Sequence, residues 1–106
     1  MATLSIHNAA QNKQFYLVRS LVTGDPKLVD ALDADQRTPL HWAASSGSVE
    51  ITQYLLNQNA EVDKPDNSGW TPLHIAVSAG NDGVVRELIG AGADVKKTND
   101  KGITPL

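Results

Sequence analysis

The chain has 106 residues, of which 41% are hydrophobic and 20% charged, and its formal net charge at pH 7 is −3. This composition predicts one soluble, intracellular globular domain over residues 1–106. It argues against a disordered tail. The sequence has no run of about 20 apolar residues, which argues against a membrane partner, and no basic patch, which argues against a nucleic-acid partner. The absence of cysteine excludes disulfides, thiolate metal sites and a cysteine nucleophile.

The first segment, residues 1–32, is a weak copy of a unit that recurs along the chain. His7 precedes His41 by slightly more than the interval that separates His41 from His74, and alanines follow His7 and His41 at the same offsets. Polar side chains such as Arg19 lie among its apolar residues, so we predict that this copy is an N-terminal cap. Gly24 is expected to end its second helix in the left-handed conformation.

The second copy, residues 33–65, contains "TPLHWAASSG", which predicts a helix with defined ends. Thr38 can cap this helix through its hydroxyl group, and Pro39 fits the first helical position because its missing N–H costs no hydrogen bond there. Gly47 is expected to end the helix. A second helix should follow, with one apolar face carried by Ile51, Leu55 and Leu56.

The third copy, residues 66–98, repeats the pattern as "TPLHIAVSAG". A partial fourth copy, residues 99–106, begins the pattern again, and its Thr104 lies as far from Thr71 as Thr71 lies from Thr38. A fixed period of this kind indicates a repeat architecture, in which stacked helical units bury one another's apolar faces. The segments "DADQR" and "PDNSGW" between the units predict turns that project from the helices.

The fourth copy is truncated before its helices. A repeat unit needs a neighbour on each side, or a polar outer face at the end of the array. The outer side of Val84 and Leu88, in the third helix pair, is therefore expected to lack a partner. We expect the sequence to be the N-terminal part of a longer array.

The segment "DNSGWTPLHIAVSAGNDGVVRELIGAGADV" resembles an ankyrin repeat along its full length. This resemblance implies an all-α fold, an ankyrin-repeat solenoid of stacked helix-turn-helix units with projecting β-hairpin turns and a concave face. Gln36 and Asn59 depart from the family pattern, which has glycine at both positions. A non-glycine residue resists positive φ, so the shape of the first hairpin stays open at Gln36.

No group of residues in the sequence has the spacing of a catalytic or metal site. His7, His41 and His74 occupy the same place in successive copies, and the resemblance implies that they hydrogen-bond the turn to the helix. No H-E-x-x-H or G-x-S-x-G motif is present, and "GAGAD" at Gly90 lacks the lysine of a phosphate-binding loop. We therefore predict that the protein is not an enzyme and has no cofactor, metal or small-molecule substrate.

We expect the function to lie in a protein-binding surface, because solenoids present a rigid concave face. The positions not needed for turn, cap or core give the predicted binding residues: Asp35, Arg37, Trp42, Ser45, Ser46, Asn67, Ser68, Trp70, Ser78 and Lys101. Trp70 suits a binding hot spot, although packing against its neighbouring hairpin explains it equally well. Arg37 also fits a surface ion pair with Asp35, and Trp42 fits the core or the groove lining.

The stretches "DADQRTPLHWAASSG" and "DNSGWTPLHIAVSAGNDGVV" together resemble the gankyrin-type chaperones of proteasome assembly. That resemblance implies binding to the C-terminal domain of an ATPase subunit of the proteasome regulatory particle, in the cytoplasm and nucleus. It also implies that Arg37 pairs with an acidic stretch of that domain. The alternative is a generic ankyrin adaptor or inhibitor that binds a different protein through the same concave face. A segment whose partner-binding residues lie mostly in other repeats is a third reading.

Overall fold

The computed structural model describes residues 5–106, and this range consists of helices joined by loops. The first four residues of the predicted domain and of its first repeat lie outside the described residues. The α-helices are α1 (Ile6–Gln11), α2 (Phe15–Gly24), α3 (Pro39–Ser46), α4 (Val49–Asn57), α5 (Pro72–Ser78) and α6 (Asp82–Gly90), and a 3₁₀ helix, η1 (Pro26–Asp30), follows α2. No residue from 5 to 106 forms a strand, so the predicted all-α fold is confirmed.

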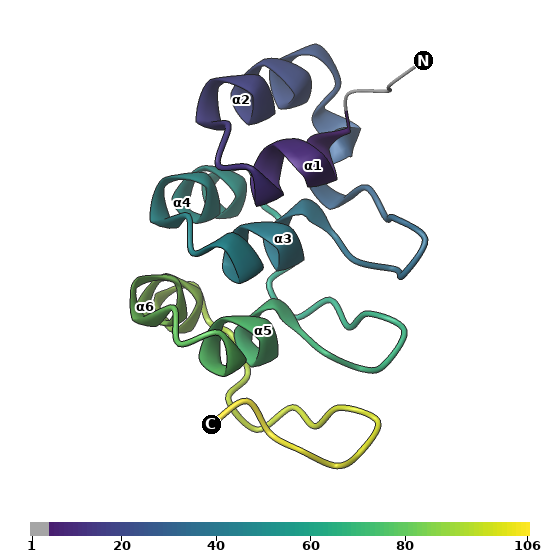
Figure 1. Ribbon diagram of the computed structural model, residues 1–106, viewed down its shortest axis with the longest axis vertical. Helices are drawn as coiled ribbons and strands as arrows, with labels where there is room; N and C mark the ends of the chain where they lie inside the picture. The colour runs from purple at the N-terminus through teal and green to yellow at the C-terminus, as the bar shows by residue number, and fades with distance from the viewer. Residues whose placement is uncertain (1–4) are drawn as a thin grey trace.

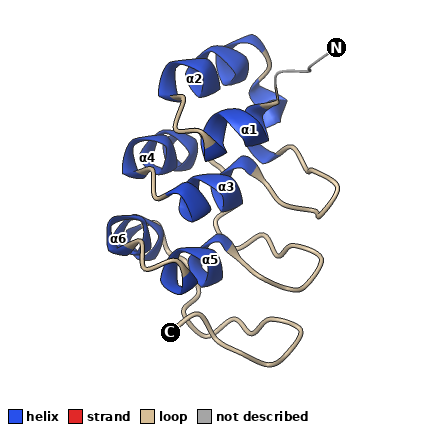
Figure 2. Ribbon diagram, in the orientation of Figure 1, coloured by secondary structure: helices blue, strands red, loops and turns tan. Residues whose placement is uncertain are grey.

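The helices form three pairs stacked along the long axis of the molecule (Figure 1). Helices α1, α3 and α5 make one row, in which α3 contacts both neighbours, and α2, α4 and α6 make a second row beside it. The loops before α3, before α5 and after α6 project on the side of the first row that faces away from the second (Figure 2). This arrangement is the solenoid expected from the repeat period.

The projecting loops have the shape of hairpins but are too short to form strands. In each loop a backbone bond joins the two ends of the hairpin, from Asp33 N–H to the carbonyl of Arg37 at 3.0 Å, from Asp66 to Trp70 at 2.9 Å and from Asn99 to Ile103 at 2.9 Å. Gln36 adopts a φ of 61° and still donates to the carbonyl of Asp33 at 3.1 Å. The first hairpin therefore keeps the family shape without glycine, at a conformational cost of about 1 kcal/mol.

The local sequence explains where the inner helices begin and end. The Thr71 hydroxyl accepts the N–H of His74 at 3.3 Å, and Pro72 follows at the first helical position, as predicted. At the C-terminal end of α3, the inner helix of the preceding repeat, Gly47 takes a left-handed φ of 77°. Glycine is favoured there because a side chain would be strained.

Gly24 does not end α2 in the left-handed conformation, and that prediction is wrong. The helix includes Gly24, and the chain leaves it through Asp25 in the extended conformation, at φ −147°. The reason is Pro26, since the residue before a proline is excluded from helical geometry by contact with the proline ring. The Asp25 side chain then accepts the N–H of Lys27 at 3.2 Å and caps η1.

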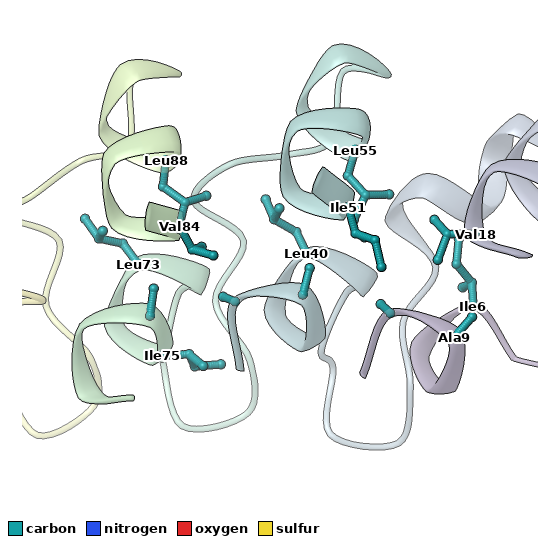
Figure 3. Packing of buried hydrophobic residues seen from close by; sticks show 14 of the residues in the cluster. Ile6, Ala9, Val18, Leu40, Ile51, Leu55, Leu73, Ile75, Val84 and Leu88 are labelled. Carbon is teal, nitrogen blue, oxygen red and sulfur yellow. The ribbon is translucent and has the colours of Figure 1, made fainter. Parts of the chain in front are cut away.

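The core runs as one continuous layer through all three helix pairs (Figure 3). Leu40, Leu55 and Leu73 have no exposed surface, and Val84 and Leu88 are also fully buried. The expectation that Val84 and Leu88 face an open end is therefore wrong, because α5 within the pair and α4 in the preceding pair already cover α6. The large exposed apolar side chains beyond this layer include Ile89, Ile103 and Leu106.

Candidate protein-binding surface

A hollow of about 330 Å³ lies between the second and third repeats, where two hairpins meet the inner helices α3 and α5. Five of the ten predicted binding residues line it. The full lining consists of Arg37, Ser45, Asp66, Ser68, Trp70, Ile75, Ser78 and Ala79. The helix side of the hollow consists of Ser45 on α3 and of Ile75, Ser78 and Ala79 on α5 and at its end, and the hairpins supply the other lining residues.

Arg37 is the fixed cation of this hollow. Its Nε donates to Asp66 Oδ2 at 3.0 Å, and its guanidinium carbon lies 5.3 Å from the ring centroid of Trp42. The suggested pair with Asp35 does not form, because stacking of successive hairpins places Asp66 beside Arg37 instead. The side chain of Arg37 keeps 32% of its surface exposed, whereas that of Asp66 keeps only 4%. The guanidinium group is therefore accessible to solvent, and the carboxylate that binds it is buried.

Trp42 supports Arg37 rather than lining the hollow. Its indole Nε1 donates to Asp33 Oδ2 at 2.8 Å, which fixes the ring beneath the guanidinium group. A cation that is stacked and hydrogen-bonded in this way loses little side-chain entropy when it meets a partner. Trp42 therefore contributes to preorganisation of the surface.

Asp66 was not among the predicted binding residues, yet it organises the hairpin. Its Oδ1 accepts the N–H groups of Ser68 and Trp70, each at 2.9 Å. Burial acts to raise the pKa of Asp66, but these two bonds and the Arg37 guanidinium outweigh it and hold the pKa below its ordinary value. Asp66 is therefore a carboxylate at neutral pH and holds Arg37 in place.

Ser46 faces the stack instead of the hollow. Its single hydroxyl proton is shared between two carbonyls, that of Ala10 in the first repeat at 3.1 Å from Oγ and that of Ala43 at 3.2 Å. Ser46 points toward the stack because it is the last residue of α3, and the end of α3 packs against the end of α1. Ser45, the next residue back, is exposed and lines the hollow.

The remaining predicted residues lie at the rim formed by the hairpin tips. The N–H of Asn67 donates to the carbonyl of Asp35 at 3.0 Å, and the N–H of Asp100 donates to that of Ser68 at 3.0 Å. These bonds join each tip to the next. Lys101 is exposed on the last tip. Asp35, Asn67 and Lys101 therefore lie on the hairpin tips and do not line the hollow.

His41 and His74 each tie an inner helix to two turns, whereas His7 on α1 makes one such contact, from Nε2 to the carbonyl of Ala31 at 2.7 Å. His41 Nδ1 accepts the N–H of Thr38 at 3.0 Å, and its Nε2 lies 2.9 Å from the carbonyl of Trp70 in the next repeat. His74 makes the same pair of contacts, with Thr71 at 3.1 Å and Ile103 at 2.8 Å. The predicted bond from turn to helix is confirmed, and the bridge to the following repeat extends it.

Neither a metal centre nor a membrane-spanning helix is found in the described part of the chain. No group of three or more histidine and acidic side chains within residues 5–106 could hold a metal ion. In the same range no helix has the length and hydropathy needed to cross a bilayer.

Residues 6–99 match the model of ankyrin repeats, in three copies. The chain belongs to the ankyrin-repeat family. Ankyrin-repeat arrays are protein-binding modules, with extended concave surfaces set by the stacking of their repeats. The hollow beside Arg37 lies between the hairpins and the inner helices of such an array.

Two similar relatives of this ankyrin-repeat chain are proteasome proteins. It is 40% identical over 72 residues to the probable 26S proteasome regulatory subunit p28 of Saccharomyces cerevisiae, covering 65% of this chain and 32% of that protein. It is 41% identical over 69 residues to the 26S proteasome non-ATPase regulatory subunit 10 of Homo sapiens, covering 65% and 30%. The chain thus spans about a third of the length of these relatives.

A third ankyrin-repeat match belongs to a different class of protein. The chain is 45% identical over 49 residues to the serine/threonine-protein kinase VIK of Arabidopsis thaliana, covering 46% of this chain and 11% of the kinase. The shared segment is shorter than in the proteasome relatives. Similarity over the repeats alone therefore does not select one partner.

Proposed function

We propose that the concave face binds the C-terminal domain of an ATPase subunit of the proteasome regulatory particle, and that the protein acts there as an assembly chaperone in the cytoplasm and nucleus. The observation that carries this proposal is the similarity of about 40% to 26S proteasome regulatory subunits of yeast and human across 65% of the chain.

The geometry of the hollow supports a protein partner with acidic side chains. Arg37 offers a positioned cation, Trp70 offers a half-buried aromatic side chain, and the small residues Ser45 and Ser78 leave room for a partner to approach. Arginine and tryptophan are the residue types that most often dominate binding energy at interfaces. Arg37 is proposed to pair with an acidic stretch of the ATPase domain, with Trp70 and the serines in contact around it.

The proposal is tested by binding of the chain to the purified C-terminal domains of the regulatory-particle ATPases, measured one by one by calorimetry. One domain is expected to bind. Arg37→Glu is expected to weaken that binding at least about tenfold, because a carboxylate would face the partner's acidic groups. Arg86→Glu is the matched control, since Arg86 is exposed on α6 away from the hollow. Binding to none of the domains would overturn the proposal.

A second candidate is an adaptor or inhibitor that uses the same face to bind a different protein. The match to a plant protein kinase favours it, because closely similar repeats occur outside the proteasome. A pull-down from cell extract distinguishes the two. Recovery of an ATPase subunit supports the assembly chaperone, whereas recovery of another protein in an Arg37-dependent manner supports the adaptor.

A further inference from the structure

One position of the inner helix carries tryptophan in the second repeat and isoleucine in the third. Trp42 and Ile75 stand four residues after Thr38 and Thr71, so they occupy the same place in α3 and α5. Ile75 lines the hollow, whereas Trp42 does not. The side chain of Ile75 lies on the side of α5 away from Leu88 (Figure 3). The contacts of Trp42 therefore show which space a ring fills when it stands at this position.

In the second repeat the chain fills that space itself. The indole of Trp42 donates to Asp33 Oδ2, and the ring lies beside the guanidinium group of Arg37. In the third repeat Asp66 takes the place of Asp33, but Ile75 has neither a ring nor a donor. Arg37 from the preceding repeat binds Asp66 Oδ2 instead, at 3.0 Å. The space that the indole takes in the second repeat is therefore left open in the third.

The walls of this open space suit an aromatic ring. Trp70 lines it with a half-buried aromatic side chain, and Ile75 adds an apolar surface that is 9% exposed. Arg37 adds a planar cation with two faces, of which Trp42 takes one. Rings pack favourably against other rings, and the face of a ring attracts a guanidinium group. A ring in the hollow would meet both kinds of contact.

Size and charge favour an uncharged side chain inside the hollow. Its volume of about 330 Å³ is at the low end of the roughly 300–1,000 Å³ of ligand sites, which suits one side chain. Arg37 and Asp66 are the charged residues of the lining, and they are paired with each other. The hollow therefore has no net charge to attract an anion into it. The acidic group of the partner meets Arg37 at its solvent-exposed part.

We propose that the hollow receives an aromatic side chain of the partner, which lies against Ile75 and Trp70 in the kind of place that Trp42 fills one repeat earlier. The ring anchors the partner, and the acidic stretch beside it pairs with Arg37. This inference rests on the proposed function, because the ring is assigned to the ATPase domain that the concave face binds.

The first test looks for the ring directly, by nuclear magnetic resonance of the complex. The chain is deuterated except at its isoleucine methyl groups, and the ATPase C-terminal domain that binds it keeps its protons. We expect nuclear Overhauser signals between the Ile75 methyl group and aromatic protons, which can then come only from the partner. The methyl group of Ile89, exposed on α6 outside the hollow, should give none. Signals to aliphatic protons alone, or no signal at Ile75, would overturn the inference while the proposed function stands.

The second test fills the hollow from within. Ile75→Trp places a ring where the preceding repeat already carries one, and it should weaken binding of the ATPase domain at least about tenfold in calorimetry. Ile89→Trp makes the same change at an exposed position and should stay within about twofold of wild type. Equal affinity of the two variants would count against the inference. The first test uses the wild-type chain, so it decides the matter even if Ile75→Trp does not fold.

Free indole separates this inference from the proposed function. If wild type binds none of the ATPase domains, the proposed function fails, but indole still tests what the hollow accepts. We expect indole to shift the Nε1–H signal of Trp70 in wild type in a saturable manner, and to leave that signal unchanged in Ile75→Trp. The absence of a shift in wild type would show that the hollow does not accept a ring.

Discussion

The aspartate that closes each of the first two hairpins also links that hairpin to a cation or an aromatic ring. Asp66 does so most completely, because its two oxygens accept the N–H groups of Ser68 and Trp70 and the Nε of Arg37. The bond with Arg37 crosses from one repeat to the next, and the other two close the turn. The hollow is therefore held in shape by a few polar residues rather than by the apolar core alone.

Asp66→Asn should destabilise the fold, because an amide in this place would lose its charge-assisted bond with Arg37. We expect a loss of about 1–3 kcal/mol in the free energy of unfolding, measured by urea denaturation. A double-mutant cycle with Arg37→Met isolates the pair. Additive effects of the two substitutions would show that Arg37 and Asp66 do not stabilise each other.

The buried His41 should make the free energy of unfolding depend on pH. Burial lowers the pKa of His41, and the bond to the Trp70 carbonyl only partly opposes this. The folded chain therefore holds His41 neutral while the unfolded chain takes up a proton near pH 6.5, so stability should fall as the pH drops below about 6.5.

The comparison for His41 is with His41→Gln, since glutamine can make both hydrogen bonds and does not titrate. Urea unfolding of both proteins at about pH 7.5 and 5.5 measures the difference. Wild type is expected to lose more stability than His41→Gln over this interval. Equal losses would mean that His41 does not contribute to the pH dependence.

At the scale of the elements, the ends of the helices decide how one repeat meets the next. Gly47 turns the chain in the left-handed conformation between α3 and α4, and a Cβ there would lie 3.0 Å from Asn81 Oδ1 of the following repeat. Asn81 in turn donates to the carbonyl of Ala44 at 2.7 Å. Gly24 ends α2 without a positive φ, and a Cβ added to it would meet no atom within 4 Å.

The same substitution should therefore have opposite signs at these two glycines. Gly47→Ala is expected to destabilise the chain by about 1–2 kcal/mol, because alanine is strained at positive φ. Gly24→Ala is expected to stabilise it by up to about 1 kcal/mol, because alanine favours the helix. Thermal unfolding of both variants measures this, and equal signs would contradict the assigned backbone conformations.

Features encoded locally could be predicted from the sequence, and features made by stacking could not. The fixed repeat period, Pro72 at the helix start and Gly47 at the helix end were enough to predict the solenoid. The Arg37–Asp66 pair joins successive repeats, and only the stacking distance of the hairpins brings the two side chains together. The inward direction of Ser46 likewise depends on the neighbouring repeat.

At the scale of the whole molecule, the stack combines one apolar layer with one polar face. The core fixes the spacing of the repeats, and the histidine and aspartate bridges fix the hairpins on that spacing. A partner can then bind a surface that needs little reorganisation. The central claim is that this partner occupies the hollow between the second and third repeats.

The most direct measurement of that claim is the affinity of the ATPase C-terminal domain for Ser78→Arg and Ser20→Arg, determined by calorimetry. Ser78 lines the hollow, and Ser20 is exposed on α2 outside it, so the same bulky cation is added inside and outside the site. We predict that Ser78→Arg weakens binding at least about tenfold while Ser20→Arg stays within about twofold of wild type. Equal affinity of the two variants would place the partner elsewhere on the molecule and contradict the account.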